Sequence, residues 1–141
     1  MANDRPFFDT NVLLYLFSGD TSKADAAESV MVQGGTISVQ VLNEFTSVAQ
    51  RKMGMSIPEI RAVLGPIRDV SSVVPLHEET HDDALRIADR YGYSFWDALI
   101  LASALEAGCS ILYTEDMQAG QLVEQSLRII NPFLDGAENP S

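Results

Sequence analysis

The chain lacks several features that would place it in a common class. Its single cysteine, Cys109, excludes an internal disulfide and suits a reducing cytoplasm. Because Cys109 begins an apolar run, we expect it in the core and not as a nucleophile. No apolar run reaches the roughly 18 residues of a membrane span. The N-terminus shows no basic-then-apolar secretory pattern. We therefore expect a cytoplasmic protein with no membrane segment.

Basic residues are also scarce. Nine lysines and arginines face twenty acids, which gives a net charge of −11. Such a balance argues against a broad basic face for nucleic acid. It suits bound divalent cations, a basic protein partner or plain solubility. The adjacent pair Arg51-Lys52 is expected to be a solvated helix end.

The length and apolar content suit one domain with a proper core. At 141 residues with 46% hydrophobic side chains, the chain is predicted to form a single domain over 1–134. The Gly-, Pro- and polar-rich tail, 135–141, is expected to be disordered. Short strand candidates at 7–8, 36–38, 72–76, 110–113 and 127–130 alternate with helical stretches at 10–17, 21–33, 39–53, 80–91, 95–107 and 120–125. A further helix opens at Ser56 and is expected to weaken or end at Gly65-Pro66. This alternation predicts an α/β fold with a mostly parallel sheet covered on both faces.

The segment Phe7-Phe8-Asp9-Thr10-Asn11 indicates a buried strand that turns directly into a helix. Asp9 then lies at the carboxyl end of the strand, where open α/β sheets bind their ligands. The simpler interpretation is that Asp9 only caps the next helix.

Three more acids are candidates for the same sheet edge. Glu44 falls on the apolar face of its own helix, where an ionised carboxylate is costly unless something pairs with it. Asp97 heads an apolar helical stripe, although Ser94-x-x-Asp97 also resembles a capping box. Asp116 follows a buried strand as Asp9 does, with a turn residue as the alternative. Glu115 alternates to the other side and ranks lower.

Taken together, these four acids predict a metal site. Parallel topology brings strand ends and the starts of following helices to one edge. Carboxylates gathered there would repel each other, and they suit Mg²⁺ or Mn²⁺ as oxygen ligands. Such a site can activate water and assist the leaving oxygen of a phosphodiester.

At these residues the chain resembles a known family, the PIN-domain proteins of the VapC-type toxin ribonucleases. The matching segments are Phe8-Asp9-Thr10-Asn11-Val12-Leu13, Asn43-Glu44-Phe45, Ser94-Phe95-Trp96-Asp97-Ala98-Leu99, Tyr113-Thr114-Glu115-Asp116 and Ile129-Ile130-Asn131-Pro132-Phe133. The resemblance implies a three-layer α/β/α sandwich and a Mg²⁺- or Mn²⁺-dependent endoribonuclease. It also implies the metal-binding and catalytic acids Asp9, Glu44, Asp97 and Asp116, with Thr10, Asn11 and Thr114 orienting them as a second shell. Further implications are an RNA substrate, a cognate antitoxin of a type II toxin–antitoxin module, and a homodimer.

Three alternatives remain open. The segment His77-Glu78-Glu79-Thr80-His81 matches the zinc-peptidase pattern H-E-x-x-H. However, Thr80 is expected to cap the helix, which would leave His77 outside it and the pair on different faces. A receiver-like domain would need a lysine at a strand end, but Lys23 and Lys52 fall in predicted helices. The third alternative is a catalytically weak PIN-like binding module.

Overall fold

The molecule is built on a six-stranded sheet. The structure is a computed structural model, and it describes residues 5–134 of the chain. The predicted tail, 135–141, lies outside the described residues. The strand order is β3-β2-β1-β4-β6-β5, and every neighbouring pair is parallel except β5 and β6. The strands are β1 (Phe7–Phe8), β2 (Gly35–Ser38), β3 (Ser71–Val74), β4 (Ile111–Tyr113), β5 (Leu122–Val123) and β6 (Leu127–Ile130).

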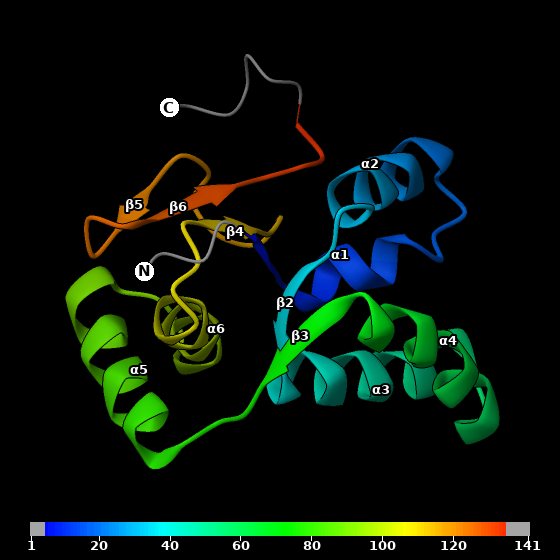
Figure 1. Ribbon diagram of the computed structural model, residues 1–141, viewed down its shortest axis with the longest axis horizontal. Helices are drawn as coiled ribbons and strands as arrows, with labels where there is room; N and C mark the ends of the chain where they lie inside the picture. Colours follow the sequence, from blue (N-terminus) through cyan, green and yellow to red (C-terminus); the bar gives the residue numbers. More distant parts are fainter. Residues whose placement is uncertain (1–4, 135–141) are drawn as a thin grey trace.

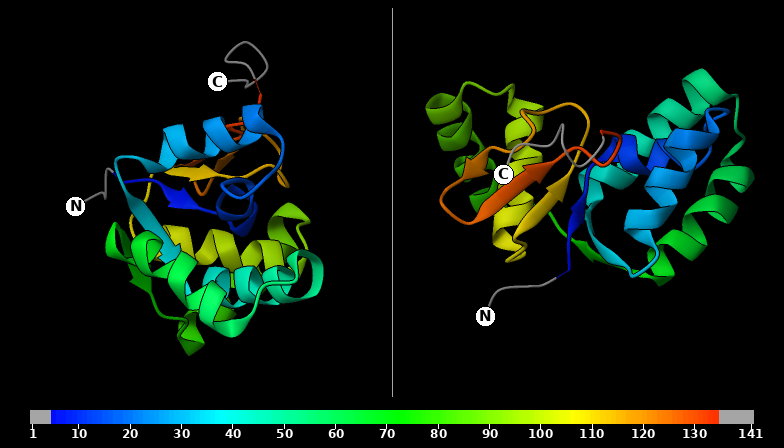
Figure 2. Two further views of the ribbon diagram at one scale, coloured as in Figure 1. Left: turned by 90° about the vertical axis from the view of Figure 1, so that its right-hand side faces the viewer. Right: turned by 90° about the horizontal axis from the view of Figure 1, so that it is seen from above.

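Helices cover both faces of this sheet, which confirms the predicted α/β class with a mostly parallel sheet (Figure 1). In Figure 2, α2 lies over one face, and α5 and α6 lie over the other. The helices are α1 (Thr10–Tyr15), α2 (Thr21–Met31), α3 (Val39–Met53), α4 (Ile57–Asp69), α5 (Glu78–Tyr91) and α6 (Phe95–Glu106).

Local sequence signals account for most of these boundaries. Ser38 caps α3 through a bond from the Val41 amide, and Gly54 ends α3 in the left-handed conformation, where a residue without a Cβ is favoured. Ser56 and Glu59 form the predicted capping box of α4. The two phenylalanines of β1 are fully buried, and Cys109 is only 3% exposed, as expected for a core residue. The strongest predictions were therefore those in which caps and apolar pattern agree.

Helix α4 departs from the prediction, because it continues through Gly65-Pro66 to Asp69. A proline inside a helix loses one backbone hydrogen bond and crowds the preceding turn. Here the helix buries Ile60, Leu64 and Ile67 against the core. The packing of this apolar face outweighs the local cost of the proline.

The predicted helix over 120–125 is also wrong, because β5 occupies this region and forms a hairpin with β6. Glu124 and Gln125 both have positive φ, 51° and 60°, between Val123 and Ser126. Two successive positive-φ residues form the turn that matches the twist of a tight hairpin. Glu124 is held there by Arg86, Arg90 and the Tyr91 hydroxyl of α5.

Gly35 in β2 and Gly65 in α4 allow a test of how closely β2 packs against β1. A Cβ on Gly35 would stand 2.6 Å from the Pro6 carbonyl oxygen and even closer to the Phe8 ring, whereas one on Gly65 would meet nothing within 4 Å. We expect Gly35→Ala to lower the free energy of unfolding by about 2 kcal/mol through overpacking. Gly65→Ala should raise it by about 1 kcal/mol, since alanine is the better helix former. Denaturant unfolding of both variants checks this, and equal effects of one sign would contradict the close approach of β1 and β2.

Candidate functional site

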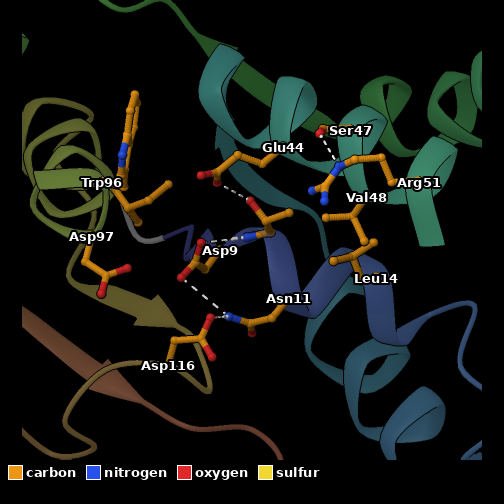
Figure 3. A pocket seen from close by; sticks show the side chains of 12 residues that line it. Asp9, Asn11, Leu14, Glu44, Ser47, Val48, Arg51, Trp96, Asp97 and Asp116 are labelled. Atoms are coloured by element: carbon orange, nitrogen blue, oxygen red, sulfur yellow. Dashed lines mark hydrogen bonds between the residues drawn. The ribbon is translucent and has the colours of Figure 1, made fainter. Parts of the chain in front are cut away.

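The pocket of interest opens at the carboxyl ends of β1 and β4, beside the beginnings of α1 and α6 and the middle of α3 (Figure 3). Its volume is about 310 Å³. All four predicted acids line it: Asp9, Glu44, Asp97 and Asp116. The structure therefore brings together residues that are up to 107 positions apart in the sequence.

Asp9 is the innermost of these acids and is only 5% exposed. It is the N-cap of α1, and its Oδ1 accepts a bond of 2.7 Å from the Thr10 amide. The Thr114 hydroxyl donates to its Oδ2 at 2.8 Å. Burial raises the pKa of Asp9 to about 7, with a further rise from the charges of Glu44 and Asp116, although these two hydrogen bonds oppose it. The capping role and a role in the pocket are thus compatible.

Glu44 is half-buried on α3 and is held from two sides. The Thr10 hydroxyl donates to its Oε1 at 2.7 Å, and Gln40 Nε2 lies 3.4 Å from its Oε2. The same amide nitrogen donates to the Trp96 carbonyl at 3.1 Å. Gln40 is 4% exposed and connects α3 to the first turn of α6, a connection that sequence reasoning missed. Neither helix periodicity nor capping statistics distinguishes such an amide from an ordinary polar residue.

Asp116 is exposed and sits on the loop after β4, where Asn11 holds it. Asn11 Nδ2 donates to Asp116 Oδ2 at 3.1 Å and to the Thr114 hydroxyl at 3.1 Å, while its Oδ1 accepts from the Glu115 amide. The Asp116 amide in turn donates to the Thr114 hydroxyl. The side chains of Asn11 and Thr114 therefore fix the Asp116 loop to Asp9.

Asp97 is half-buried in the first turn of α6, where the Ser94 hydroxyl accepts a bond from its amide at 3.2 Å. Burial raises the pKa of Asp97, and the charges of Asp116 and Glu44 raise it further. The charges of Glu44 and Asp116 thus act on both Asp9 and Asp97.

The donor set of this pocket is one of oxygens, which is the chemistry that Mg²⁺ and Mn²⁺ prefer. The pocket holds four carboxylates that repel one another, and one of them is buried. A bound divalent cation would neutralise part of this negative charge. Within 5–134, however, no three His, Cys, Asp or Glu side chains are arranged to hold a metal ion as they stand. A Mg²⁺ ion held by one or two of these carboxylates and by water does not need such a cluster.

Lys23 and Glu115 form a separate cluster beside the pocket. Lys23 Nζ binds Glu115 Oε2 at 3.0 Å and the Tyr15 hydroxyl at 3.0 Å, and that hydroxyl also contacts Glu115. This ties α2 to the loop that carries Asp116. The lysine lies in α2 as predicted and does not line the pocket, so it does not provide the lysine that a receiver-like site requires.

The histidine motif does not form a site among the described residues. His77 is the N-cap residue of α5, so the predicted cap, Thr80, is wrong by one turn. Thr80 instead accepts from the His77 amide and donates to Glu106. His81 is exposed on α5 and packs against Phe95. The conclusion that His77 lies outside the helix holds.

Comparison with known proteins places the chain in a family. The sequence pattern of the PIN domain matches residues 7–122. Since this match covers most of the chain, the protein belongs to the PIN domain family. It has no match among curated proteins. Within residues 5–134, no helix is long and apolar enough to cross a membrane.

Solved structures share the fold at low sequence identity. A toxin–antitoxin complex from Klebsiella pneumoniae is 20% identical, with a TM-score of 0.68 over 90% of this chain and 97% of that chain. VapC20 from Mycobacterium tuberculosis, a toxin that cleaves the sarcin-ricin loop, is 21% identical, with a TM-score of 0.66 over 79% and 89%. FitAcB from Neisseria gonorrhoeae is 15% identical, with a TM-score of 0.67 over 91% and 98%. These likenesses confirm the predicted VapC-type PIN fold.

Proposed function

We propose that the protein is a Mg²⁺- or Mn²⁺-dependent endoribonuclease that hydrolyses RNA phosphodiester bonds. The observation that carries this proposal is the convergence of Asp9, Glu44, Asp97 and Asp116 on one pocket at the edge of the sheet. Membership of the PIN domain family and the VapC-type structural neighbours support it. A bound cation would polarise the phosphoryl oxygen and lower the pKa of water.

The chain's own residues would then act in distinct ways. Asp9, Glu44, Asp97 and Asp116 would hold the cation, and a carboxylate not neutralised by it would accept the proton of the attacking water. Thr10 orients Glu44, and Thr114 orients Asp9. Asn11 keeps Asp116 turned toward Asp9. These three neutral side chains fix the acids by hydrogen bonds without adding charge.

The toxin–antitoxin neighbours suggest the biological setting. We infer that this chain is the toxin of a type II module in the cytoplasm, forms a homodimer and is blocked by a cognate antitoxin. Its net charge of −11 suits a basic antitoxin segment that reaches the carboxylate pocket. Size-exclusion chromatography with light scattering tests the homodimer, and a search of the neighbouring reading frames for a small protein with a basic segment, followed by co-expression, tests the antitoxin.

The enzymatic proposal is tested by incubating purified protein with single-stranded RNA in Mg²⁺, in Mn²⁺ and in EDTA. We expect cleavage with either metal and none in EDTA, restored when metal is added in excess. RNA binding without cleavage in any divalent metal would instead establish the binding-module alternative. Cleavage that persists in EDTA would remove the metal from the account.

The zinc-hydrolase alternative has its own test. His77→Ala and His81→Ala should each leave RNA cleavage within a few-fold of wild type, because neither side chain lines the acidic pocket. Rates of RNA cleavage in Mg²⁺ measure this, with circular dichroism as the check on folding. A folded variant that loses all activity would show that the histidines belong to the site.

A further inference from the structure

The rim of the acidic pocket carries an exposed aromatic side chain. Trp96, the only tryptophan in the chain, is 63% exposed and lines the pocket beside Asp97. Its backbone is fixed, because it lies in the first turn of α6 and its carbonyl accepts from Gln40. The ring of Phe95 supports the indole edge-on, with the ring centres 5.3 Å apart. Single exposed apolar residues are common, but this one lies at the mouth of a polar site on a fixed stretch of backbone.

A cationic side chain faces it from the α3 side. Arg51 lines the pocket with its Nε donating to the Ser47 hydroxyl at 3.1 Å. No acid within residues 5–134 lies within 4.0 Å of its guanidinium, although four acids share the pocket. Figure 3 shows Trp96 on the α6 side, Arg51 on the α3 side and Glu44 between them. Arg51 was expected to be a solvated helix end, and its position in the last turn of α3 is consistent with that, but it also lines the pocket.

The chemistry of these two side chains suits the base and the phosphate of a nucleotide. Arginine binds phosphate through paired donors, and a tryptophan face stacks on any base. A pocket of about 310 Å³ lies at the lower end of the size range of small-molecule sites. We propose that Trp96 stacks on an unpaired base of the RNA while Arg51 binds a phosphate next to the bond that is cleaved.

This inference rests on the proposed ribonuclease function and assigns two side chains of this chain to the binding of an unpaired segment of RNA. A base can stack on Trp96 only after it leaves its neighbours, as bases in loops and single strands do. Because so acidic a chain repels the phosphates of RNA, a basic side chain is needed to bind them. Among the described residues that line the pocket, Arg51 is the basic one. The two residues would bind substrate and leave the chemistry to the acids.

The fluorescence of Trp96 tests the stacking directly, since no other tryptophan contributes. A short single-stranded RNA is titrated into the full chain with Ca²⁺ and with Mg²⁺, and emission is excited where tyrosine does not absorb. We expect saturable quenching by the single strand and much weaker quenching by its fully paired duplex. Equal quenching by both, or none, would overturn the stacking.

Substitutions separate the two contacts. Trp96→Ala should weaken RNA binding about tenfold or more, and Trp96→Phe should recover most of the loss. Arg51→Gln should also weaken binding, with the slope of log affinity against log salt reduced by about 0.7, the value for one phosphate of a single strand. Arg61→Gln is the matched control, because Arg61 is an exposed arginine of α4 that does not line the pocket. Equal losses in the Arg51 and Arg61 variants would contradict a specific phosphate contact.

The outcomes also separate this inference from the enzymatic one. RNA cleavage without any quenching of Trp96 would overturn the stacking and leave the ribonuclease proposal intact. Quenching without cleavage in any divalent metal would reject the ribonuclease proposal while Trp96 still bound RNA. A shift of the Trp96 emission that depends on protein concentration and occurs without RNA would assign the indole to a contact between two copies of the chain, which would also overturn the inference.

Discussion

Asp97→Asn should lower the rate of RNA cleavage in Mg²⁺ by at least about a hundredfold, because the loss of one carboxylate disturbs both the cation and the attacking water. Asp97 lines the pocket. The hydrogen bond that caps α6 runs from the backbone amide of Asp97 to the Ser94 hydroxyl, so it does not depend on the Asp97 carboxylate. The substitution keeps the shape of the side chain and the cap of α6. The fold should therefore be retained while the activity is lost.

The matched control for this substitution is Asp89→Asn. Asp89 is an exposed acid of α5 that does not line the pocket, so its variant should cleave RNA at the wild-type rate. Single-turnover rates at saturating protein compare the three proteins. Full activity in Asp97→Asn would remove Asp97 from the site, and equal losses in both variants would show a general effect of charge.

Asp9→Asn should be more stable than wild type when metal is absent and the pH is above about 7. Folding raises the pKa of Asp9 from 3.8 to about 7, mainly by burial. The ionised carboxylate is therefore disfavoured in the folded state. The resulting cost is absent below the unfolded pKa, grows as the pH rises from about 4 to about 7, and is complete above that.

The variant removes this cost but also weakens one contact. The shift from 3.8 to about 7 corresponds to on the order of 4 kcal/mol. The amide nitrogen that replaces Oδ2 is a donor, so it cannot accept the hydrogen bond from the Thr114 hydroxyl. We expect a net gain of about 2 kcal/mol at pH 8 and a loss at pH 4. Urea unfolding in EDTA at both pH values measures this. A variant less stable than wild type at pH 8 would show that the Thr114 and Thr10 bonds outweigh the burial.

Saturating Mn²⁺ should reverse the order of stability at pH 8. A ligand that binds only the folded state stabilises by mass action, and the wild type offers the stronger site. Wild type should therefore become the more stable protein. Comparing the unfolding of the two proteins with and without Mn²⁺ thus distinguishes a carboxylate that only stabilises the fold from a carboxylate that binds a cation.

Sequence could predict that these acids gather at one edge of the sheet, because they stand beside strong local signals. Asp9 follows two buried phenylalanines, and Asp116 follows a strand with a buried centre, Leu112. Two parallel strands that pair with each other bring their ends together, as β1 and β4 do. The identity of the most buried acid could not be predicted. Periodicity drew attention to Glu44, which is only half-buried, whereas the depth of Asp9 depends on how the sheet and helices close over it.

The errors lie where tertiary contacts override local preference. Nothing in the letters around Glu124 indicates a turn, since neither it nor Gln125 is a residue that favours positive φ. The contacts from Arg86 and Arg90 on α5 hold that turn, and they are invisible in a linear reading. Arg51 is exposed at the end of α3, as expected, but its place in the lining of the pocket could not be predicted, because it depends on the packing of α3 beside α1.

Calorimetric titration of Mn²⁺ tests the central claim most directly. At a pH of about 6.5 Asp9 is partly protonated, so binding at the four acids should release protons and the observed heat should depend on the ionisation enthalpy of the buffer. Wild type should bind Mn²⁺ with this proton release, and the double variant Asp9→Asn, Asp116→Asn should bind at least tenfold more weakly without it. Equal affinity and equal proton release in the two proteins would place the cation elsewhere and contradict a metal site built from these acids.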